Sequence, residues 1–178
     1  MQDKSIAMQK ETSVAAWSPP TSGYTKLNFD ASFVDQSGSG GIGLILRNET
    51  GLFLIAKAIH LSHCLHARNA EALAARKALN LASEMLLSHL IVEGDSCGVI
   101  SFVDTNQPLP PNIEVIVLDC KRLKHLFQKI CFNFSPRTGN RSAHVVANYS
   151  RSNNGTTTWT SFSPPWLISS LRDEIGFC

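Results

Sequence analysis

The chain has 178 residues, enough for one domain with a substantial core and too few for two comfortable domains. With 43% hydrophobic and 17% charged residues, its composition is globular and excludes an intrinsically disordered chain. The net charge of +2 permits contact with a polyanion but does not by itself indicate one.

The cysteines and the hydrophobic runs indicate the cellular compartment of the protein. The five cysteines are odd in number, scattered and without a C-x-x-C pair, which is typical of reduced thiols. The first residues lack the apolar region of a secretory signal, and no apolar run reaches transmembrane length. We therefore expect an intracellular protein, nuclear or cytoplasmic, that is not secreted, contacts no membrane and is a monomer.

Strand patterns dominate the first third of the chain, after a polar lead-in over 1–24 that we expect to be flexible. In 26–32 apolar and polar residues alternate, which predicts a strand with Asp30 on the face opposite the core-directed side chains. The runs 42–47 and 52–58 are apolar and β-prone, and the turn residues between them predict a hairpin. Three antiparallel strands therefore come first.

The hydrophobic period then changes to that of a helix, from residue 67 to about residue 87. One apolar stripe there comprises Ala70, Leu73, Ala74, Ala78, Leu81 and Met85. The short apolar run 90–93 follows this helix, so we expect a buried strand parallel to the first one.

The remaining patterns predict three more helices and one more strand, at 96–104, 113–127, 130–134 (the strand) and 142–149. The predicted order is β-β-β-α-β-α-α-β-α. It corresponds to an α/β fold with a mixed five-stranded sheet flanked by helices. We place the domain at 25–152 and a C-terminal extension at 153–178.

Three acidic residues stand at predicted strand ends or helix starts, namely Asp30, Glu71 and Asp95. Such positions hold side chains rigidly toward a shared point. Converging carboxylates without a dedicated Cys/His set suit hard cations such as Mg²⁺ or Mn²⁺. Two such ions can bind the attacking and the leaving oxygens of a phosphodiester.

Three other patterns have a functional and a structural interpretation. The segment 38–43 matches G-x-G-x-x-G, but a strand continues where a dinucleotide site needs a helix, so we interpret its glycines as allowing a turn and a close backbone approach. The group His60, His63, Cys64 and His66 lacks a second distant ligand pair for zinc and is interpreted as a polar loop beside a substrate groove. The basic residues Lys121, Arg122, Lys124 and Lys129 suit either a solvated helix face or phosphate contacts.

Four segments in this order resemble type 1 ribonuclease H, and specifically plant ribonuclease H-like domains related to non-LTR retrotransposon reverse transcriptases. They are Asn-Phe-Asp-Ala-Ser (28–32), Ala-Glu-Ala-Leu-Ala-Ala (70–75), Val-Glu-Gly-Asp-Ser (92–96) and Pro-Arg-Thr-Gly-Asn-Arg-Ser-Ala (136–143). The flanking Trp17-Ser18-Pro19-Pro20 and Pro164-Pro165-Trp166-Leu167 also fit, so the resemblance covers roughly 17–178.

The resemblance implies a nucleic-acid-binding endoribonuclease that cleaves the RNA strand of RNA–DNA hybrids by a two-metal mechanism with Mg²⁺ or Mn²⁺. It implies that Asp30, Glu71 and Asp95 bind the metals, with Glu71 in the first turn of its helix. For contacts to the 2′-hydroxyl of the RNA, the nearest candidates are Ser32 and Asn69.

Two positions depart from the pattern of the resembled family. His144 stands where the family usually has a fourth acid, and Phe134 stands where many members have a histidine. The fourth metal ligand is then the imidazole of His144 or nothing, and imidazole suits Mn²⁺ better than Mg²⁺. His144 is also a candidate catalytic acid or base. The alternatives are a catalytically weakened or inactive nucleic-acid-binding remnant of a retrotransposon ribonuclease H, and a structural or protein-interaction domain.

Overall fold

The computed structural model describes residues 16–175, which form six strands and five α-helices with two short 3₁₀ turns. In chain order the strands and α-helices are β1 (Thr25–Val34), β2 (Ser39–Arg47), β3 (Phe53–Leu61), α1 (Ala67–Glu84), β4 (His89–Gly94), α2 (Cys97–Asp104), α3 (Glu114–Leu123), β5 (Lys129–Phe134), α4 (Arg141–Ser152), β6 (Thr156–Thr160) and α5 (Pro165–Ile175). The predicted α/β class and the predicted order through α4 are confirmed.

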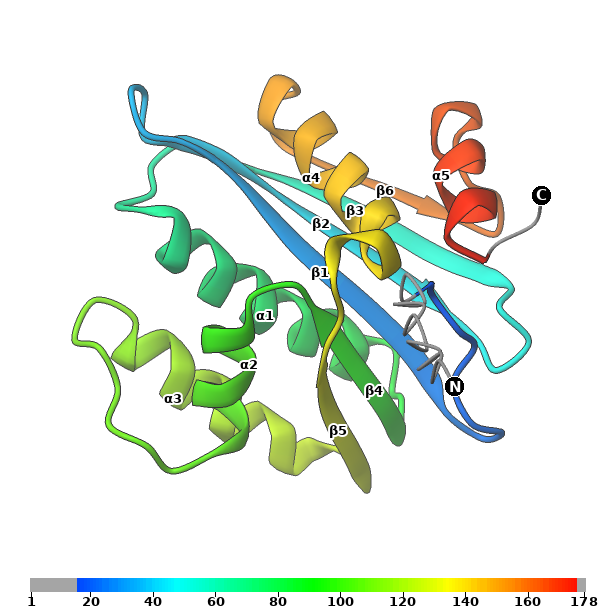
Figure 1. Cartoon of the computed structure of the whole chain (residues 1–178), viewed down its shortest axis with the longest axis horizontal. Coiled ribbons are helices and arrows are strands. Elements are labelled where there is room, and N and C mark those ends of the chain that lie inside the picture. The colour runs from blue at the N-terminus through cyan, green and yellow to red at the C-terminus, as the bar shows by residue number, and fades with distance from the viewer. Residues whose placement is uncertain (1–15, 176–178) are drawn as a thin grey trace, which may run out of the picture.

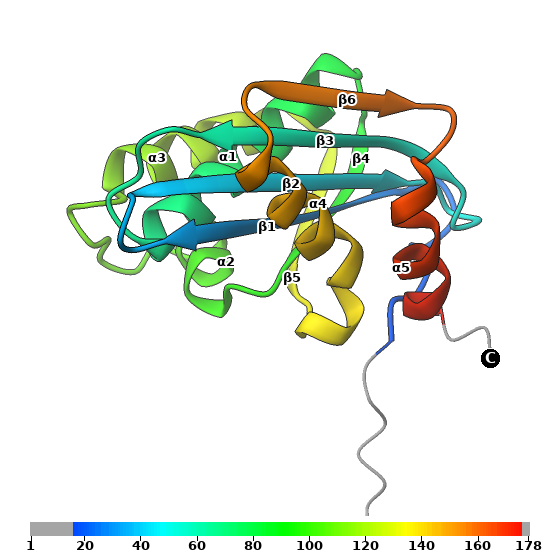
Figure 2. The ribbon, with the colours of Figure 1, turned by 90° about the horizontal axis from the view of Figure 1, so that it is seen from above.

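The strands form one mixed sheet in the order β5-β4-β1-β2-β3-β6. β1, β4 and β5 run parallel, whereas β2, β3 and β6 are each antiparallel to their neighbours. Helices α1, α2 and α3 cover one face of the sheet, and α4 and α5 cover the other (Figures 1 and 2). Both faces of the central strands are therefore shielded from water.

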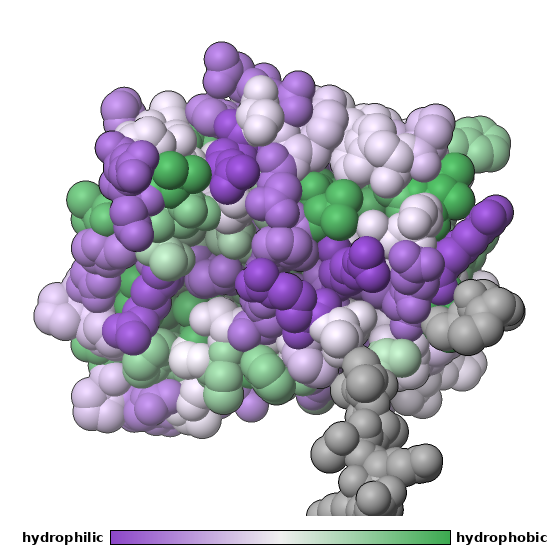
Figure 3. Space-filling model, turned by 45° about the horizontal axis from the view of Figure 1, so that its top comes forward, coloured by the Kyte–Doolittle hydropathy of each residue, from purple (hydrophilic) through white to green (hydrophobic). Residues whose placement is uncertain are grey.

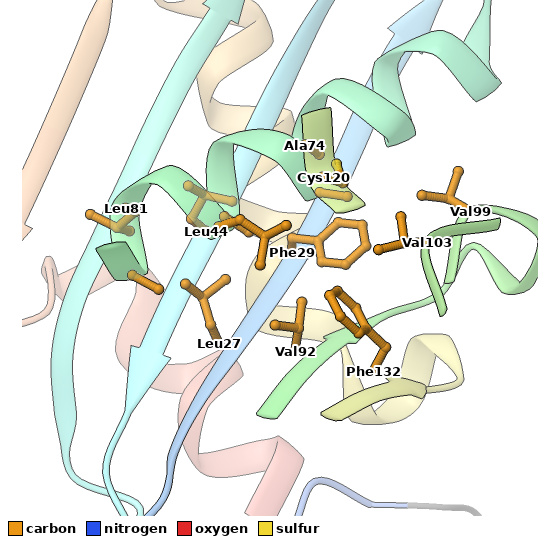
Figure 4. Close-up of a cluster of buried hydrophobic side chains, with 14 of the residues drawn as sticks. Leu27, Phe29, Leu44, Ala74, Leu81, Val92, Val99, Val103, Cys120 and Phe132 are labelled. Carbon is orange, nitrogen blue, oxygen red and sulfur yellow. The ribbon is translucent and has the colours of Figure 1, made fainter. Parts of the chain in front are cut away.

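The larger hydrophobic core lies between the sheet and α1 (Figure 4). Alternation along β1 directs Leu27 and Phe29 into this core, and both are fully buried. The small side chains of α1 let the helix lie close to the strands, and Ala74 and Ala78 are completely buried against them. The same alternation turns Asn28 and Asp30 toward α4 on the other face.

On that other face, glycines of β2 allow α4 to lie directly on the sheet. A Cβ atom on Gly41 or Gly43 would overlap the backbone of α4, at Ala147 and Ala143 among other residues. A second core there contains Ile45, Ala56, Ala58, Ala143, Val146 and Leu167. The glycines of the G-x-G-x-x-G match thus serve the close backbone approach that the sequence predicts.

The prediction of five strands is wrong by one, because β6 extends the sheet beyond β3. The strand β6 pairs antiparallel with β3 from Thr156 opposite Ile59 to Thr160 opposite Ile55. Four of its five residues are threonine, so it has no hydrophobic alternation for a sequence pattern to detect. Its strand conformation depends on pairing with the edge of β3.

Both ends of the described chain pack on the sheet. Trp17, within the predicted lead-in, is 4% exposed, and its backbone N–H donates to the carbonyl of Glu174 at 2.9 Å. The remaining lead-in residues 1–15 lie outside the described residues.

None of the helices in 16–175 is both long and apolar enough to span a bilayer. The face drawn in Figure 3 is mainly hydrophilic, with separate hydrophobic areas between polar side chains.

Candidate active site

Two of the predicted acids meet because they follow the last paired residues of neighbouring parallel strands. In the β1–β4 ladder the final pair is Phe29 with Gly94, so Asp30 and Asp95 come next in their chains. A Cβ on Gly94 would collide with the Phe29 ring, so glycine is needed at this point of the sheet. The carboxyl ends of parallel strands share one edge, and the two carboxylates therefore lie side by side.

The third acid comes from α1. A ligand oxygen of Glu71 lies within 4.8 Å of one from Asp30 and one from Asp95, which places all three predicted acids in a single cluster. The backbone of Ala31 in β1 also favours the charged form of the Glu71 carboxyl and thereby lowers its pKa. Because α1 begins at Ala67, Glu71 lies beyond the first turn, and the prediction that it lies in that turn is wrong.

Burial disfavours the charged form of two of these carboxyl groups, Glu71 and Asp30. Burial raises the pKa of Glu71 to about 9, with further increases from the charges of Asp30 and Asp95. Burial also raises the pKa of Asp30 to about 6, against an opposing effect of its hydrogen bond with His144. Among the described residues, Asp30 Oδ1 and Glu71 Oε2 are buried without a hydrogen-bond donor. Buried, unsatisfied carboxylate oxygens fit the ligand preference of a hard divalent cation.

His144 lies against this cluster, and a chain of hydrogen bonds defines its tautomer. Arg151 can only donate, so Ser32 Oγ accepts from it at 3.3 Å and donates to Asn148 Oδ1 at 2.9 Å. The other amide atom, Asn148 Nδ2, then donates to His144 Nε2 at 2.9 Å. The network therefore assigns the ring hydrogen to Nδ1, which donates to Asp30 Oδ2 at 2.7 Å.

A cationic side chain contacts the acids from the segment before α4. Arg137 donates through Nε and Nη2 to Asp95 Oδ2, both at 3.1 Å. Its side chain is 63% exposed, whereas that of Asp95 is 12% exposed. The guanidinium thus lies on the solvent side of the cluster and offsets part of its negative charge.

The other predicted site residues have contacts of their own. Asn69 is nearly buried at the start of α1, where its amide donates to the Asn112 carbonyl at 3.3 Å and accepts from the Cys64 thiol at 3.1 Å. Ser32 belongs to the hydrogen-bond chain that ends at His144. Phe134 pairs with Gly94 at the end of β5, and its half-exposed ring offers no hydrogen-bonding group beside Asp95.

Sequence reasoning did not identify two residues that contact the predicted site residues, namely Asn148 on His144 and Arg137 on Asp95. Asn148 could have been found, because it lies four residues after His144 and therefore on the same face of a helix. Arg137 lies within a segment that carries the family resemblance, but no spacing rule connects it with Asp95. Its role depends on the loop between β5 and α4, which only the folded chain defines.

A mixed sheet in which aspartates of two neighbouring parallel strands meet a glutamate of the helix α1 is the arrangement of a type 1 ribonuclease H-like domain. The chain belongs to the reverse transcriptase-like family, whose profile matches residues 28–150. A search of curated protein sequences found no match.

Solved structures show the same fold at low sequence identity. The ribonuclease H1 of Halobacterium salinarum is 18% identical, with a TM-score of 0.67 over 73% of this chain and 98% of its own. The N-terminal ribonuclease H domain of a Mycobacterium tuberculosis protein is 18% identical, with a TM-score of 0.66 over 72% of this chain and 94% of its own. LC11 ribonuclease H1, isolated from compost and solved with an RNA/DNA hybrid, is 19% identical, with a TM-score of 0.64 over 72% of this chain and 96% of its own.

Proposed function

We propose that the protein is an endoribonuclease that cleaves the RNA strand of RNA–DNA hybrids by a two-metal mechanism. The observation that carries this proposal is the meeting of the Asp30, Glu71 and Asp95 carboxylates within 4.8 Å, with buried oxygens that lack a donor. Divalent cations held there would supply Lewis-acid activation of water and charge stabilisation at the phosphodiester. The hybrid bound by LC11 ribonuclease H1, a protein of the same fold, supports the choice of substrate.

The residues around the acids keep the cluster ready to take up cations. His144 donates from Nδ1 to one oxygen of Asp30, so the other oxygen, Oδ1, stays available. Arg137 similarly contacts only Oδ2 of Asp95. In this proposal His144 orients Asp30, and its Nδ1 is a donor rather than a metal ligand.

The competing function is hybrid binding without cleavage. The observation in its favour is that His144 and Arg137 bring donors to the acids where a fourth carboxylate would bring negative charge. A less negative cluster holds two divalent cations less tightly. Cleavage of a labelled hybrid in Mg²⁺, and then in Mn²⁺, distinguishes the two functions.

The expected result is metal-dependent cleavage of the RNA strand, with Mn²⁺ at least as effective as Mg²⁺. Asp30→Asn should lower cleavage by about 100-fold or more, because one of the three carboxylates that would hold the cations is lost. The matched control is Asp35→Asn, an exposed acid of the turn after β1, which should cleave like the wild type. Binding of the hybrid without cleavage in either metal would favour an inactive nucleic-acid-binding remnant of a ribonuclease H. No binding would favour a structural or protein-interaction domain.

Substrate choice is tested separately by affinity. A hybrid offers 2′-hydroxyl groups that duplex DNA lacks, and close polar groups can read them. We propose the edge of the site around Ser32 and Asn69 for this contact. Equal affinity for duplex DNA and for hybrid, measured at one salt concentration, would contradict specific readout.

A further inference from the structure

A carboxylate from α5 caps the helix that carries His144. The Glu174 side chain accepts hydrogen bonds from the backbone N–H of Ser142 at 2.6 Å and from its hydroxyl at 2.8 Å. The residue before α4, Asn140, makes no side-chain cap of its own. A backbone N–H at a helix start has no acceptor within the helix and needs one elsewhere, and a negative charge there is favourable to the helix dipole. Glu174 supplies both.

The capping carboxylate is itself fixed by a buried cation. Arg47 Nη1 lies 3.0 Å from Glu174 Oε2, and both side chains are at most 1% exposed. The guanidinium carbon lies 3.6 Å from the ring centroid of Trp17, and Nη2 donates to Asn28 Oδ1 at 3.2 Å. Arg47 is thus sandwiched between the N-terminal segment and the C-terminal helix, and it has little freedom to move.

His144 follows Ser142 by two residues, within the first turn of α4, so a shift of the helix start also moves its imidazole. We propose that Glu174 is a positioning residue for His144, acting through Ser142 to hold the Nδ1–H of His144 on Asp30. This helix start has further support, because Asn140 donates to the Phe29 carbonyl at 2.9 Å and accepts from Asn28 at 3.1 Å, and Arg141 lies 3.7 Å from Asp173. The effect of Glu174 on cleavage rests on the proposed function, whereas its effect on the position of the imidazole does not.

The capping device lies partly outside the common family domain. The family profile covers residues 28–150, and the solved relatives align with 72–73% of this chain. Trp17 and Glu174 therefore lie outside the residues that the family profile matches. Figure 2 shows α5 beside α4 on one face of the sheet.

The sharpest test compares two double variants that differ only in the capping atom. Arg47→Met with Glu174→Gln keeps an oxygen for Ser142, and Arg47→Met with Glu174→Met removes it. Neither variant leaves an unpaired buried charge, which would otherwise dominate the result. Both lose the same contacts of Arg47 with Trp17 and Asn28, so any difference between them reports the cap.

The direct readout is the proton–nitrogen correlation spectrum of the imidazoles, with the His144 signals assigned by their loss in His144→Asn. The glutamine variant should keep the wild-type His144 signals. The methionine variant should shift them toward those of a ring free of Asp30. With cleavage measured in Mg²⁺, kcat of the methionine variant should fall by about 10- to 100-fold while KM for the hybrid stays the same.

A milder variant and a surface control complete the test. Ser142→Ala removes one of the two hydrogen bonds to Glu174 and should move the His144 signals in the same direction by a smaller amount. Arg172→Gln, on an exposed side chain of α5 two residues before Glu174, should leave them unchanged. Unchanged His144 signals in folded Ser142→Ala and in the methionine variant would overturn the proposal. A wild type that does not cleave would contradict the proposed function, and the spectra would still decide the role of Glu174.

Discussion

At the scale of single residues, hydrogen-bond donors offset part of the cost of burying the acids. Asp30 is fully buried, yet it receives a hydrogen bond from a neutral imidazole whose tautomer is fixed by Asn148 and Ser32. Deeply placed carboxylates that repel one another cost stability, and the functional use of a site usually explains why such a cost persists. The cost can be measured, because it depends on pH.

Glu71 should make the metal-free protein less stable as the pH rises. Its pKa is about 9 in the folded protein, above the ordinary 4.5, so the folded state binds the proton more tightly than the unfolded state. This contribution to stability is present at acid pH and is lost as the pH rises through the folded value. Glu71→Gln should therefore match the wild type at about pH 5 and be more stable by about 1–3 kcal/mol at about pH 9.

Denaturant unfolding in a chelator measures this difference, with Glu84→Gln as the control on the same helix. Glu84 is 65% exposed, and its replacement should leave the pH dependence unchanged. If Glu71→Gln shows the same loss of stability toward alkaline pH as the wild type, the Glu71 carboxyl ionises freely and is not the source of the effect.

His144→Asp should raise cleavage in Mg²⁺ by about 10-fold and narrow the difference from Mn²⁺. A fourth carboxylate adds an oxygen ligand and a negative charge, both of which favour Mg²⁺. The measurement is kcat in each metal. His144→Asn introduces a side chain of the same shape as aspartate but without its charge, and it should not raise cleavage. An equal response to both substitutions would show that the missing charge does not limit cleavage.

At the scale of elements, the packing of α4 on β2 places His144 beside Asp30. This packing depends on glycine, since a side chain on Gly43 would overlap the helix backbone at Ala143 and Ala147. Backbone atoms of a helix cannot move individually, so the whole of α4 would have to shift outward.

Gly43→Ala should destabilise the protein by about 1–3 kcal/mol and also weaken metal binding, because it displaces the helix that carries His144. The matched control is Gly98→Ala in α2, where a Cβ would meet nothing closer than 3.8 Å. Alanine is the better helix former, so this control should be more stable by about 0.5–1 kcal/mol. Thermal unfolding and calorimetric metal titration give both quantities, and a Gly43→Ala protein as stable as the wild type would refute the packing argument.

At the scale of the whole molecule, the chain ends complete the sheet and its second core. Strand β6 pairs with β3, Leu167 of α5 is fully buried, and Glu174 neutralises the buried Arg47. A chain that ends at residue 152 would expose apolar surface and leave Arg47 without its partner.

Such a shortened chain should be less stable than the full chain by at least about 3 kcal/mol, since it uncovers a buried charge and apolar side chains together. Adding Arg47→Met to the shortened chain should restore part of the loss, because the unpaired charge is then gone. Denaturant unfolding of the three proteins tests this. An unchanged midpoint after shortening would mean that β6 and α5 contribute little to the fold.

Most of the fold could be predicted from local patterns in the sequence. The alternation in β1, the helical stripe of α1 and the glycine-rich β2 each depend on near neighbours in the chain, so hydrophobic period and turn chemistry were sufficient. The strand β6 could not be predicted, because its threonines carry no period and become a strand only by pairing with β3.

The site divides in the same way. The sequence alone indicated Asp30, Glu71 and Asp95, because the ends of strands and the starts of helices can be recognised locally. Only the tertiary structure decided what surrounds them, including Arg137 on Asp95 and the capping of α4 by Glu174. Those contacts join residues 42 and 32 positions apart in the chain. No pattern of neighbouring residues encodes them, because these residues are distant in the chain and come into contact only when it folds.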